Sequence, residues 1–180
     1  MPWNVRRATP ADADAMGLIH VEAWRAAYGG GLMPADYLES ITPETRATMW
    51  RHALNRPRPE RSTTLVVEPS TRIVGNAFVV VGFSMVGRMD EGEDAGIGEL
   101  YVINVAPTEW GSGAGQRLHD GALVALEDAN FSSAVLWVHP DNARARAFYE
   151  RNGWTSDDVT RRETVLGVEV PEIRYSIRIS

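Results

Sequence analysis

Residues Val105 to Leu118 read VAPTEWGSGAGQRL: the apolar end of a strand breaks at Pro107 and turns through three alternate glycines into a helical pattern. The glycines are Gly111, Gly113 and Gly115. Because glycine has no Cβ, main-chain N–H groups in such a turn converge on an anion without side chains in the way, and the helix N-terminus adds a partial positive charge. The stretch therefore predicts a phosphate-binding loop in which a diphosphate would sit.

Two common nucleotide-binding loops fit this stretch poorly. A Walker loop needs a lysine and a serine or threonine after the last glycine, where this chain has Gln116-Arg117. A dinucleotide-binding fold places its glycines in a first β-α-β unit, with an acidic residue about 20 positions further on. On the loop alone, a plain connection between a strand and a helix is the remaining alternative.

The segments beside the loop alternate between strand and helix patterns. Residues 97–105 and 134–138 are rich in β-branched and aromatic residues, which predicts strands. Residues 113–127 and 142–151 predict helices, and Asn152-Gly153 ends the second one. Together these segments predict a β-α-β-α unit.

The other segments predict more helices and strands. Apolar residues at three- and four-residue spacing predict a helix from Ala13 to about Tyr28. Thr42-Pro43-Glu44 is typical of a helix start, and that helix should end near Leu54. The remaining predictions are a helical turn at 33–38, strands at 5–8, 64–68, 73–83, 163–170 and 173–179, and a solvated acidic loop at 88–94.

Composition indicates one globular domain over residues 1–180, a length that buries a sufficient core. The chain has no cysteine, which excludes disulfides, thiolate metal sites and a cysteine nucleophile. Its net charge of −6 at pH 7 disfavours nucleic acid as a partner. The start of the chain lacks the apolar stretch of a signal peptide, and the apolar runs are strand-sized, so we expect a cytoplasmic protein with no membrane partner.

A second motif lies at Leu136 to Trp154, which reads LWVHPDNARARAFYERNGW. It resembles one signature of the GNAT superfamily of N-acetyltransferases: a strand, an asparagine, a helix with Phe-Tyr, and a glycine followed by an aromatic residue. The glycine loop at Trp110 to Gly115 resembles the other signature, Gln/Arg-x-x-Gly-x-Gly/Ala. The resemblance covers most of the chain. It implies an α/β fold with a mixed, mostly antiparallel central sheet, one parallel strand pair (97–105 with 134–138) and flanking helices.

The resemblance implies that acetyl-CoA is the acyl donor. The backbone of Ile103 and Val105 would pair with the pantetheine arm like an extra strand, and Asn142 would offer its amide to that arm. Trp110 stands where the family has Gln or Arg, and an indole cannot replace a guanidinium beside a phosphate, so a weaker cofactor site or another acyl group would follow. The backbone amides implied for the diphosphate are those of Trp110, Gly111, Ser112, Gly113, Ala114, Gly115 and Gln116.

Tyr149 is the predicted general acid. It follows Asn142 by two helical turns, so both side chains address one groove. The resemblance implies that Tyr149 gives a proton to the departing CoA thiolate, and general acid catalysis of this kind contributes roughly 10² to 10⁴ in rate.

Transfer to an amine also needs a base, because an alkylammonium with a pKa near 10.4 must first lose a proton. Glu99 is the first choice, and strand alternation places it on one face with Ile103 and Val105 unless a bulge intervenes. His139, at the carboxyl end of the next strand, and a water chain are the alternatives. We expect no metal.

Trp24 and Tyr28 are the predicted residues of the acceptor site, since Trp24-x-x-x-Tyr28 resembles a subset of small-molecule GNAT enzymes. Core packing is the alternative for aromatic residues at this spacing. The expected function is direct acetylation of a primary amine of a small molecule. A protein N-terminal or lysine acetyltransferase and a non-catalytic acyl-CoA sensor are the alternatives, and a homodimer is expected by analogy only.

Overall fold

The computed structural model describes residues 3–71, 80–89, 96–165 and 167–179. Within these ranges, every helix is too short or too polar to span a lipid bilayer. The strands are β1 (Trp3–Arg7), β2 (Thr63–Pro69), β3 (Gly82–Arg88), β4 (Ile97–Val105), β5 (Ser133–Val138), β6 (Thr155–Val165) and β7 (Val168–Arg178). The helices are α1 (Ala13–Tyr28), α2 (Ala35–Ser40), α3 (Pro43–Asn55), α4 (Ala114–Asp128) and α5 (Ala143–Arg151), with 3-10 turns η1 (Pro10–Asp12) and η2 (Pro107–Glu109).

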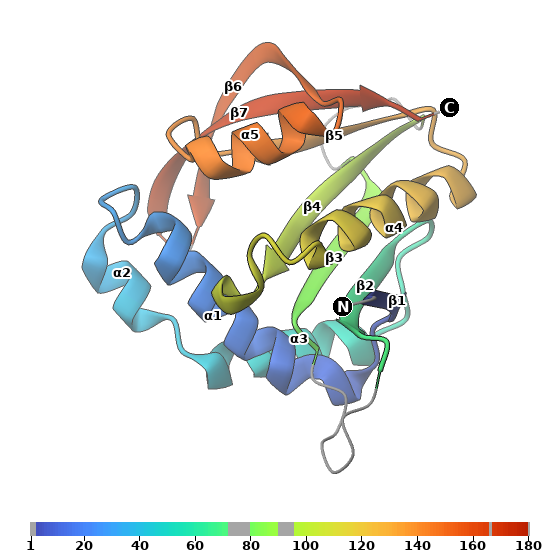
Figure 1. The fold of residues 1–180 in the computed structure, drawn as a ribbon. Coiled ribbons are helices and arrows are strands. Elements are labelled where there is room, and N and C mark those ends of the chain that lie inside the picture. The colour runs from blue at the N-terminus through green and yellow to red at the C-terminus, as the bar shows by residue number, and fades with distance from the viewer. Residues whose placement is uncertain (1–2, 72–79, 90–95, 166, 180) are drawn as a thin grey trace.

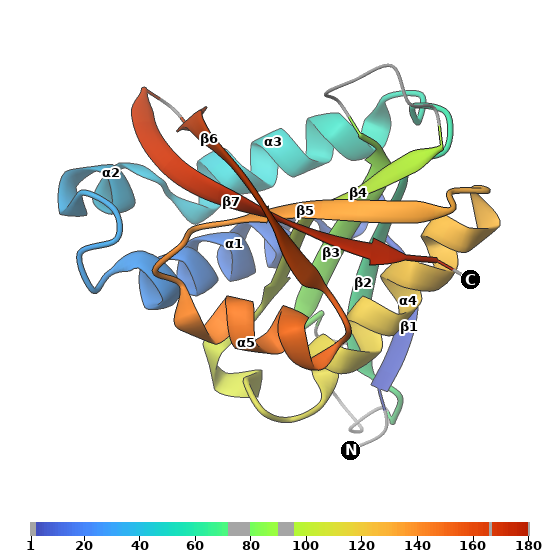
Figure 2. The same cartoon turned by 90° about the horizontal axis from the view of Figure 1, so that it is seen from above.

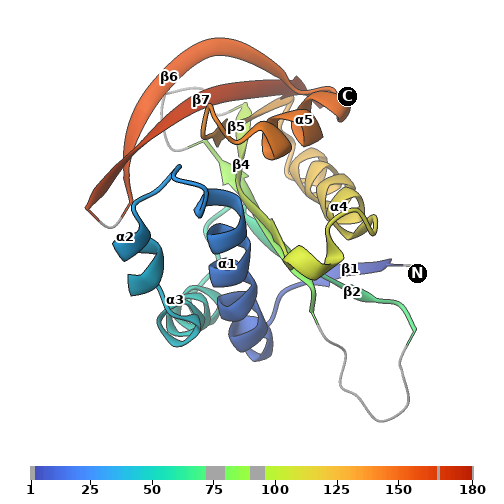
Figure 3. The ribbon, with the colours of Figure 1, turned by 60° about the vertical axis from the view of Figure 1, so that its left-hand side comes forward.

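The described strands form one seven-stranded sheet in the order β1-β2-β3-β4-β5-β7-β6 (Figure 1). Neighbouring strands are antiparallel except β4 and β5, which are parallel. Helices α1, α2 and α3 lie on one side of the sheet, and α4 and α5 lie on the other (Figures 2 and 3). The predicted fold class, a mixed and mostly antiparallel sheet with one parallel pair, is confirmed.

Helix α1 presents the predicted apolar stripe to the sheet, with Met16 and Ile19 buried. On its other side it crosses α3 at Gly17. A Cβ at Gly17 would lie 2.5 Å from the backbone nitrogen of Ala47 and from the carbonyl oxygen of Pro43. The missing side chain therefore lets the two helix backbones touch and holds them as one layer.

A β-bulge lies where β3 pairs with β4. Met85 is opposite Val102, but Val86 is opposite Leu100, so Tyr101 is an extra residue in β4. An extra residue reverses the alternation of side chains between the two sides of a sheet. Residues of β4 before and after Tyr101 therefore exchange faces relative to a regular strand.

The ladder between β4 and β5 is short, ending at the pair Glu99 and Val135. Beyond it, β4 stays paired with β3 as far as Val105, and β5 stays paired with β7 as far as Val138. Each strand is thus held by its outer neighbour while the two inner edges separate.

Two predicted segments need correction. Residues 73–79 of the predicted strand 73–83, and residues 90–94 of the predicted acidic loop 88–94, lie outside the described residues. The observed strand β3 runs from Gly82 to Arg88, beyond the predicted end at residue 83. The predicted strand 163–170 is wrong, because β6 ends at Val165 and β7 begins at Val168. Gly167, with a φ of 86°, makes the turn, and one glycine among β-branched residues is a weak turn signal.

Strand β6 forms one edge of the sheet and pairs with β7 alone. Its register shifts between Ser156 and Thr160, where Asp158 adopts a φ of 61°. Residues 155–160 are exposed. The bulged stretch therefore interrupts the regular strand at the sheet edge.

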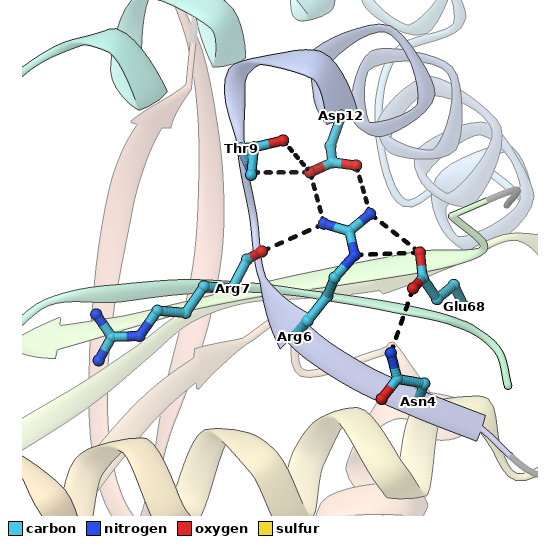
Figure 4. A network of polar contacts seen from close by, with 6 residues as sticks. All are labelled: Asn4, Arg6, Arg7, Thr9, Asp12 and Glu68. Atoms are coloured by element: carbon cyan, nitrogen blue, oxygen red, sulfur yellow. Dashed lines mark hydrogen bonds and ion pairs between the residues drawn. The ribbon is translucent and has the colours of Figure 1, made fainter.

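An ionic network with two buried carboxylates attaches β1 to β2 and to η1 (Figure 4). Arg6 donates from both terminal nitrogens to Asp12, at 2.9 and 2.8 Å, and also donates to Glu68 at 3.0 Å. Asp12 accepts from the backbone N–H of Thr9 at 2.7 Å. Asp12 and Glu68 are only 7% and 5% exposed. The guanidinium thus compensates two carboxylates that burial would otherwise penalise.

Replacing Asp12 with asparagine should lower the free energy of unfolding at pH 7 by about 1 to 3 kcal/mol, because Arg6 loses a charged, bidentate partner. Burial raises the pKa of Asp12, but hydrogen bonds from Arg6 and Thr9 outweigh it and hold that pKa below its usual value. Stability from Asp12 is therefore present above the unfolded-state pKa of about 3.9 and is lost as the pH falls through the lower folded-state pKa. Urea denaturation from pH 7 to pH 2 measures this.

Asp14→Asn is the matched control, because Asp14 makes an exposed ion pair with Arg51. It should change the free energy of unfolding by only about 0 to 1 kcal/mol. Equal effects of the two substitutions, or a loss at Asp12 that does not shrink in acid, would contradict this account.

Candidate functional site

A cleft of about 630 Å³ opens where β4 and β5 separate. One wall is the backbone of β4 from Tyr101 to Val105, and the opposite wall is Trp137 and Val138 of β5. Helix α1, the glycine loop and α5 complete it. The cleft therefore brings together the two motifs that the sequence pointed to.

The glycine loop forms the turn that the sequence predicted. Gly111 and Gly113 have φ angles of 84° and 92°, a region that favours glycine, and Gly113 directly precedes the first residue of α4. A Cβ at Gly111 would meet nothing within 4 Å, so there is room beside the loop. The indole of Trp3 donates to the carbonyl of Ser112 at 3.1 Å and holds the loop from behind.

Most of the predicted cofactor residues line the cleft, and two do not. The lining includes Ile103, Val105, Trp110, Gly111, Gly113, Gly115, Gln116 and Asn142. Ala114 is fully buried against the core, and Ser112 turns its hydroxyl to the carbonyl of Glu109 at 2.7 Å. The side chains of Ser112 and Ala114 therefore shape the loop from outside the cleft.

Trp110 has a structural partner that its sequence position does not reveal. Its indole donates to the carbonyl of Val105 at 2.9 Å. The guanidinium of Arg144, from α5, stacks over the indole ring at 3.9 Å from the centroid. Arg144 also lines the cleft. A cation thus stands beside the glycine loop even though the residue at position 110 is not basic.

Asn142 and Tyr149 address the same cleft, as predicted. The Asn142 side chain caps α5 by accepting from the backbone of Ala145 at 3.1 Å, and it also hydrogen-bonds to the hydroxyl of Tyr28. Tyr149 is 9% exposed. Its burial, and secondarily the neighbouring Tyr28, raise the pKa of Tyr149, so its hydroxyl keeps its proton at neutral pH.

Trp24 and Tyr28 line the cleft from α1. Their rings lie 5.4 Å apart in an edge-on arrangement. Burial raises the pKa of Tyr28, and the hydrogen bond from Asn142 opposes that shift. These two aromatic residues therefore line the cleft and also pack against the core.

The two candidate bases lie beside the cleft, outside its lining. Glu99 is 5% exposed and belongs to the last β4–β5 pair, at the apex of the gap. Gly98 packs against α4 residues, so Glu99 points to the α1 side, whereas Ile103 and Val105 pack on the α4 side. The bulge at Tyr101 thus overturns the expectation of one shared face.

His139 is also 5% exposed. Its ring centroid lies 6.3 Å from that of Tyr28, and its Nδ1 accepts from the backbone of Asp141 at 3.1 Å. The imidazole therefore supports the loop before α5 and packs against Tyr28.

Sequence reasoning missed several polar or aromatic residues of the cleft, among them Trp137, Arg144 and Glu172. Trp137 lies under the guanidinium of Arg161 at 4.1 Å, and Arg161 also donates to Glu172 at 2.8 Å. The only sequence signal was positional: Trp137 lies near the end of the predicted strand 134–138, and Arg144 lies at the start of the last helix. Nothing local marks Glu172.

Residues 31–154 match the family described as "Acetyltransferase (GNAT) family". The mycothiol acetyltransferase of Beutenbergia cavernae is 45% identical over 62 residues, which cover 34% of this chain and 21% of that protein. The chain spans less than a third of the length of the mycothiol acetyltransferases that it matches. The N-acetyltransferase YuaI of Bacillus subtilis is 28% identical over 139 residues, covering 77% of this chain and 73% of that protein.

The crystal structure of the PaiA N-acetyltransferase from Thermoplasma acidophilum, in complex with coenzyme A, has a similar fold. It superimposes with a TM-score of 0.70 at 17% identity, covering 99% of each chain. At this identity the likeness concerns the fold alone.

Two glycines of the loop should respond in opposite ways to alanine. Gly113→Ala should lower the free energy of unfolding by about 1 to 2 kcal/mol, because it forces an alanine into left-handed backbone space. Gly115→Ala should raise it by about 0.5 to 1 kcal/mol, because a helical alanine loses less entropy and its Cβ would meet Val105 at an ordinary 3.6 Å. Urea denaturation of both variants compares them, and equal effects would refute the loop geometry.

Proposed function

The chain belongs to the acetyltransferase (GNAT) family, and on that premise we propose that it transfers the acetyl group of acetyl-CoA directly to a primary amine of a small molecule. One observation carries the proposal: the gap between β4 and β5 joins the glycine loop to the buried hydroxyl of Tyr149 within a single cleft. Such a cleft aligns a phosphate-anchored thioester with a proton donor.

The glycine loop and Arg144 are suited to the diphosphate of acetyl-CoA. The open space beside Gly111 and the N-terminus of α4 accommodate an anion. Arg144, stacked on Trp110, adds the positive charge that the residue at position 110 lacks. The departure at Trp110 is thereby compensated from α5, which removes the reason to expect a weak site.

The free edge of β4 is suited to the pantetheine arm. Beyond Glu99 no strand pairs with β4 on its β5 side in the described part of the sheet. An extended chain would add to this edge through the backbone of Ile103 and Val105. Trp110 occupies one lone pair of the Val105 carbonyl, and the second remains available.

Acetyl-CoA, when bound, supplies an acetyl group activated as a thioester. Tyr149 is suited to act as the general acid, because its hydroxyl is protonated at neutral pH and the residue lines the cleft in which the sulfur leaves when the carbon–sulfur bond breaks. Asn142 would orient this end of the cleft through α5 and Tyr28. Tyr149 and the anchoring loop line one groove, which favours direct transfer.

Glu99 remains the proposed base, and it would act through water. It lies at the apex of the gap on the α1 side, which is the side of Trp24 and Tyr28. Its side chain is buried and outside the cleft lining, so a bridging water would relay the proton of the amine. His139 is the less suitable group, because its Nδ1 already accepts a backbone hydrogen bond.

The proposed acceptor is a small molecule because aromatic rings narrow its side of the cleft. Trp24 packs against Tyr28 at 5.4 Å and against Tyr37 at 6.4 Å. Trp24 and Tyr28 together form the proposed acceptor wall. A non-catalytic sensor has no use for the buried hydroxyl of Tyr149, which favours an enzyme.

Tyr149→Phe should reduce kcat by roughly 10² to 10⁴, because only the proton donor is lost. The dissociation constant for acetyl-CoA should stay within about twofold, since the ring still packs. A thiol-release assay with an amine panel, followed by calorimetry with acetyl-CoA, measures the two quantities. Unchanged turnover would remove Tyr149 from the mechanism.

Glu99→Gln, assayed beside Tyr149→Phe, tests the proposed base. We expect a loss of kcat at neutral pH that recovers at alkaline pH, where the amine is already neutral. A pH-independent loss would instead indicate that Glu99 only supports the structure.

Arg144→Met should weaken acetyl-CoA binding by about 1.5 to 3 kcal/mol, or roughly 10- to 150-fold, because the variant lacks one charged contact with the diphosphate. Calorimetry should show the same loss with dephospho-CoA and none with acetyl-pantetheine, which has no diphosphate. Arg178→Met is the control for net charge. Arg178 belongs to β7 and pairs with Ser133 at the start of β5, whereas the cleft lies at the other end of β5. Equal losses for all three ligands would contradict the proposed role of Arg144.

A further inference from the structure

Five side chains between the sheet and helices α1 to α3 each have at least one buried polar atom without a hydrogen-bond partner. We call these residues the inner polar cluster: His20, Tyr37, Arg46, Trp50 and Asn104. The unpartnered atoms are both ring nitrogens of His20, the hydroxyl of Tyr37, Nε of Arg46, the indole nitrogen of Trp50 and Nδ2 of Asn104. Buried polar atoms of this kind are rare, because an unmade hydrogen bond destabilises the folded state. Their gathering on one side of the sheet indicates a site for a polar group.

Ring contacts connect the three aromatic members of the cluster, in part through Trp24. The ring centroid of His20 lies 5.0 Å from that of Trp24 and 6.2 Å from that of Trp50. Tyr37 lies 6.4 Å from Trp24. His20, Tyr37 and Trp50 are each 6% exposed, so these groups do not obtain their partners from the molecular surface.

The cluster adjoins the acceptor side of the cleft. Asn104 belongs both to the cluster and to the cleft lining, and Trp24 lines the cleft while packing on His20. Asn104 is therefore the member of the cluster that lines the cleft, whereas Arg46, on α3, does not line it. A substituent of a molecule held against Trp24 would enter here.

The charge of the cluster is positive. In the described part of the chain no carboxylate pairs with Arg46, whose Nη1 instead contacts the sulfur of Met49 at 3.6 Å. Burial, and secondarily Arg46, lower the pKa of His20 to about 4, so its imidazole is neutral at pH 7. Burial raises the pKa of Tyr37, and the neighbouring Arg46 opposes that shift only in part, so the hydroxyl is neutral as well and lies beside the guanidinium. The guanidinium is then the single formal charge among these five residues.

We propose that the inner polar cluster receives a carboxylate of the acceptor, so that the small molecule acetylated in the cleft is an amine that also carries a carboxylate, as an amino acid does. A guanidinium with neighbouring hydroxyl, imidazole, indole and amide donors matches the acceptor-only chemistry of a carboxylate. A purely cationic amine would meet Arg46 with like charge. This inference rests on the proposed acetyl transfer, whose substrate class it names.

One acidic residue, Glu172, lines the cleft, and it is already paired with Arg161 at 2.8 Å. Three other acidic residues that a cationic acceptor could use lie outside the cleft. Asp36 and Glu39 are exposed on α2, and Glu169 lies 3.7 Å from Arg162 on the β6–β7 hairpin. None of the three lines the cleft. The overall negative charge of the chain therefore says little about the group that enters beside Trp24.

The test compares matched amines that differ only in the carboxylate. The protein saturated with free CoA is titrated by calorimetry with the common L-amino acids, with their C-terminal amides and with the corresponding decarboxylated amines. We expect at least one amino acid to bind, with its amide and decarboxylated amine bound roughly tenfold to a hundredfold more weakly. Thiol release with acetyl-CoA should rank the same compounds in the same order of kcat/KM.

Arg46→Met should abolish the preference for the acid while leaving the affinity for CoA unchanged. Arg51→Met is the matched control on α3, because Arg51 is exposed and pairs with Asp14. It should keep the preference. Tyr37→Phe provides a second variant in case Arg46→Met unfolds, and it should reduce the preference by a smaller factor.

Equal binding of acid and amide, binding of no amino acid at all, or a preference that survives Arg46→Met would each overturn the carboxylate assignment. Failure of the proposed function has a different signature, namely no binding of acetyl-CoA or no thiol release with any amine. Selective binding of acids without turnover would support the cluster and reject the enzyme.

Discussion

The separation of β4 from β5 is the constraint on which the rest of the site depends. Three residue pairs join the two strands, and each strand then stays with its outer neighbour, β3 or β7. A parallel pair that opens in this way leaves main-chain hydrogen-bonding groups without a strand beside them. Such groups are costly to bury unpaired, so the opened edge favours an extended ligand that pairs with it. The glycine loop and α5, which meet where Arg144 stacks on Trp110, then complete the lining of the gap.

The sequence predicted best what is local. The glycines at 111, 113 and 115 and the run from Asn142 to Tyr149 place a turn, a cap and a helical face within a few residues of one another, so pattern alone located them. The bulge at Tyr101 could not be predicted, because it depends on which residue of β3 stands opposite. The turn at Gly167 was missed because valines on both sides favour strand.

Several groups in the cleft come from distant segments of the chain, so a motif examined one position at a time does not predict them. Trp110 looks like the loss of a cation, yet the guanidinium of Arg144 from another helix stacks on its ring. The inner polar cluster is assembled from α1, α2, α3 and β4, and each member taken alone reads as ordinary core. Glu172 enters the cleft from a strand near the end of the chain. These groupings exist only once the fold has brought distant segments together.

The two edge strands of the sheet affect the tendency of the protein to aggregate at high concentration. An open sheet offers a row of N–H and C=O groups at each outer strand, which is a template for fibre growth. Strand β1 has only five residues, and β6 is kinked where its register shifts, at Asp158. A strand from another copy could therefore pair with either edge over only a short length. The β6 kink, which contributes nothing to the cleft, thus acts as a safeguard against aggregation.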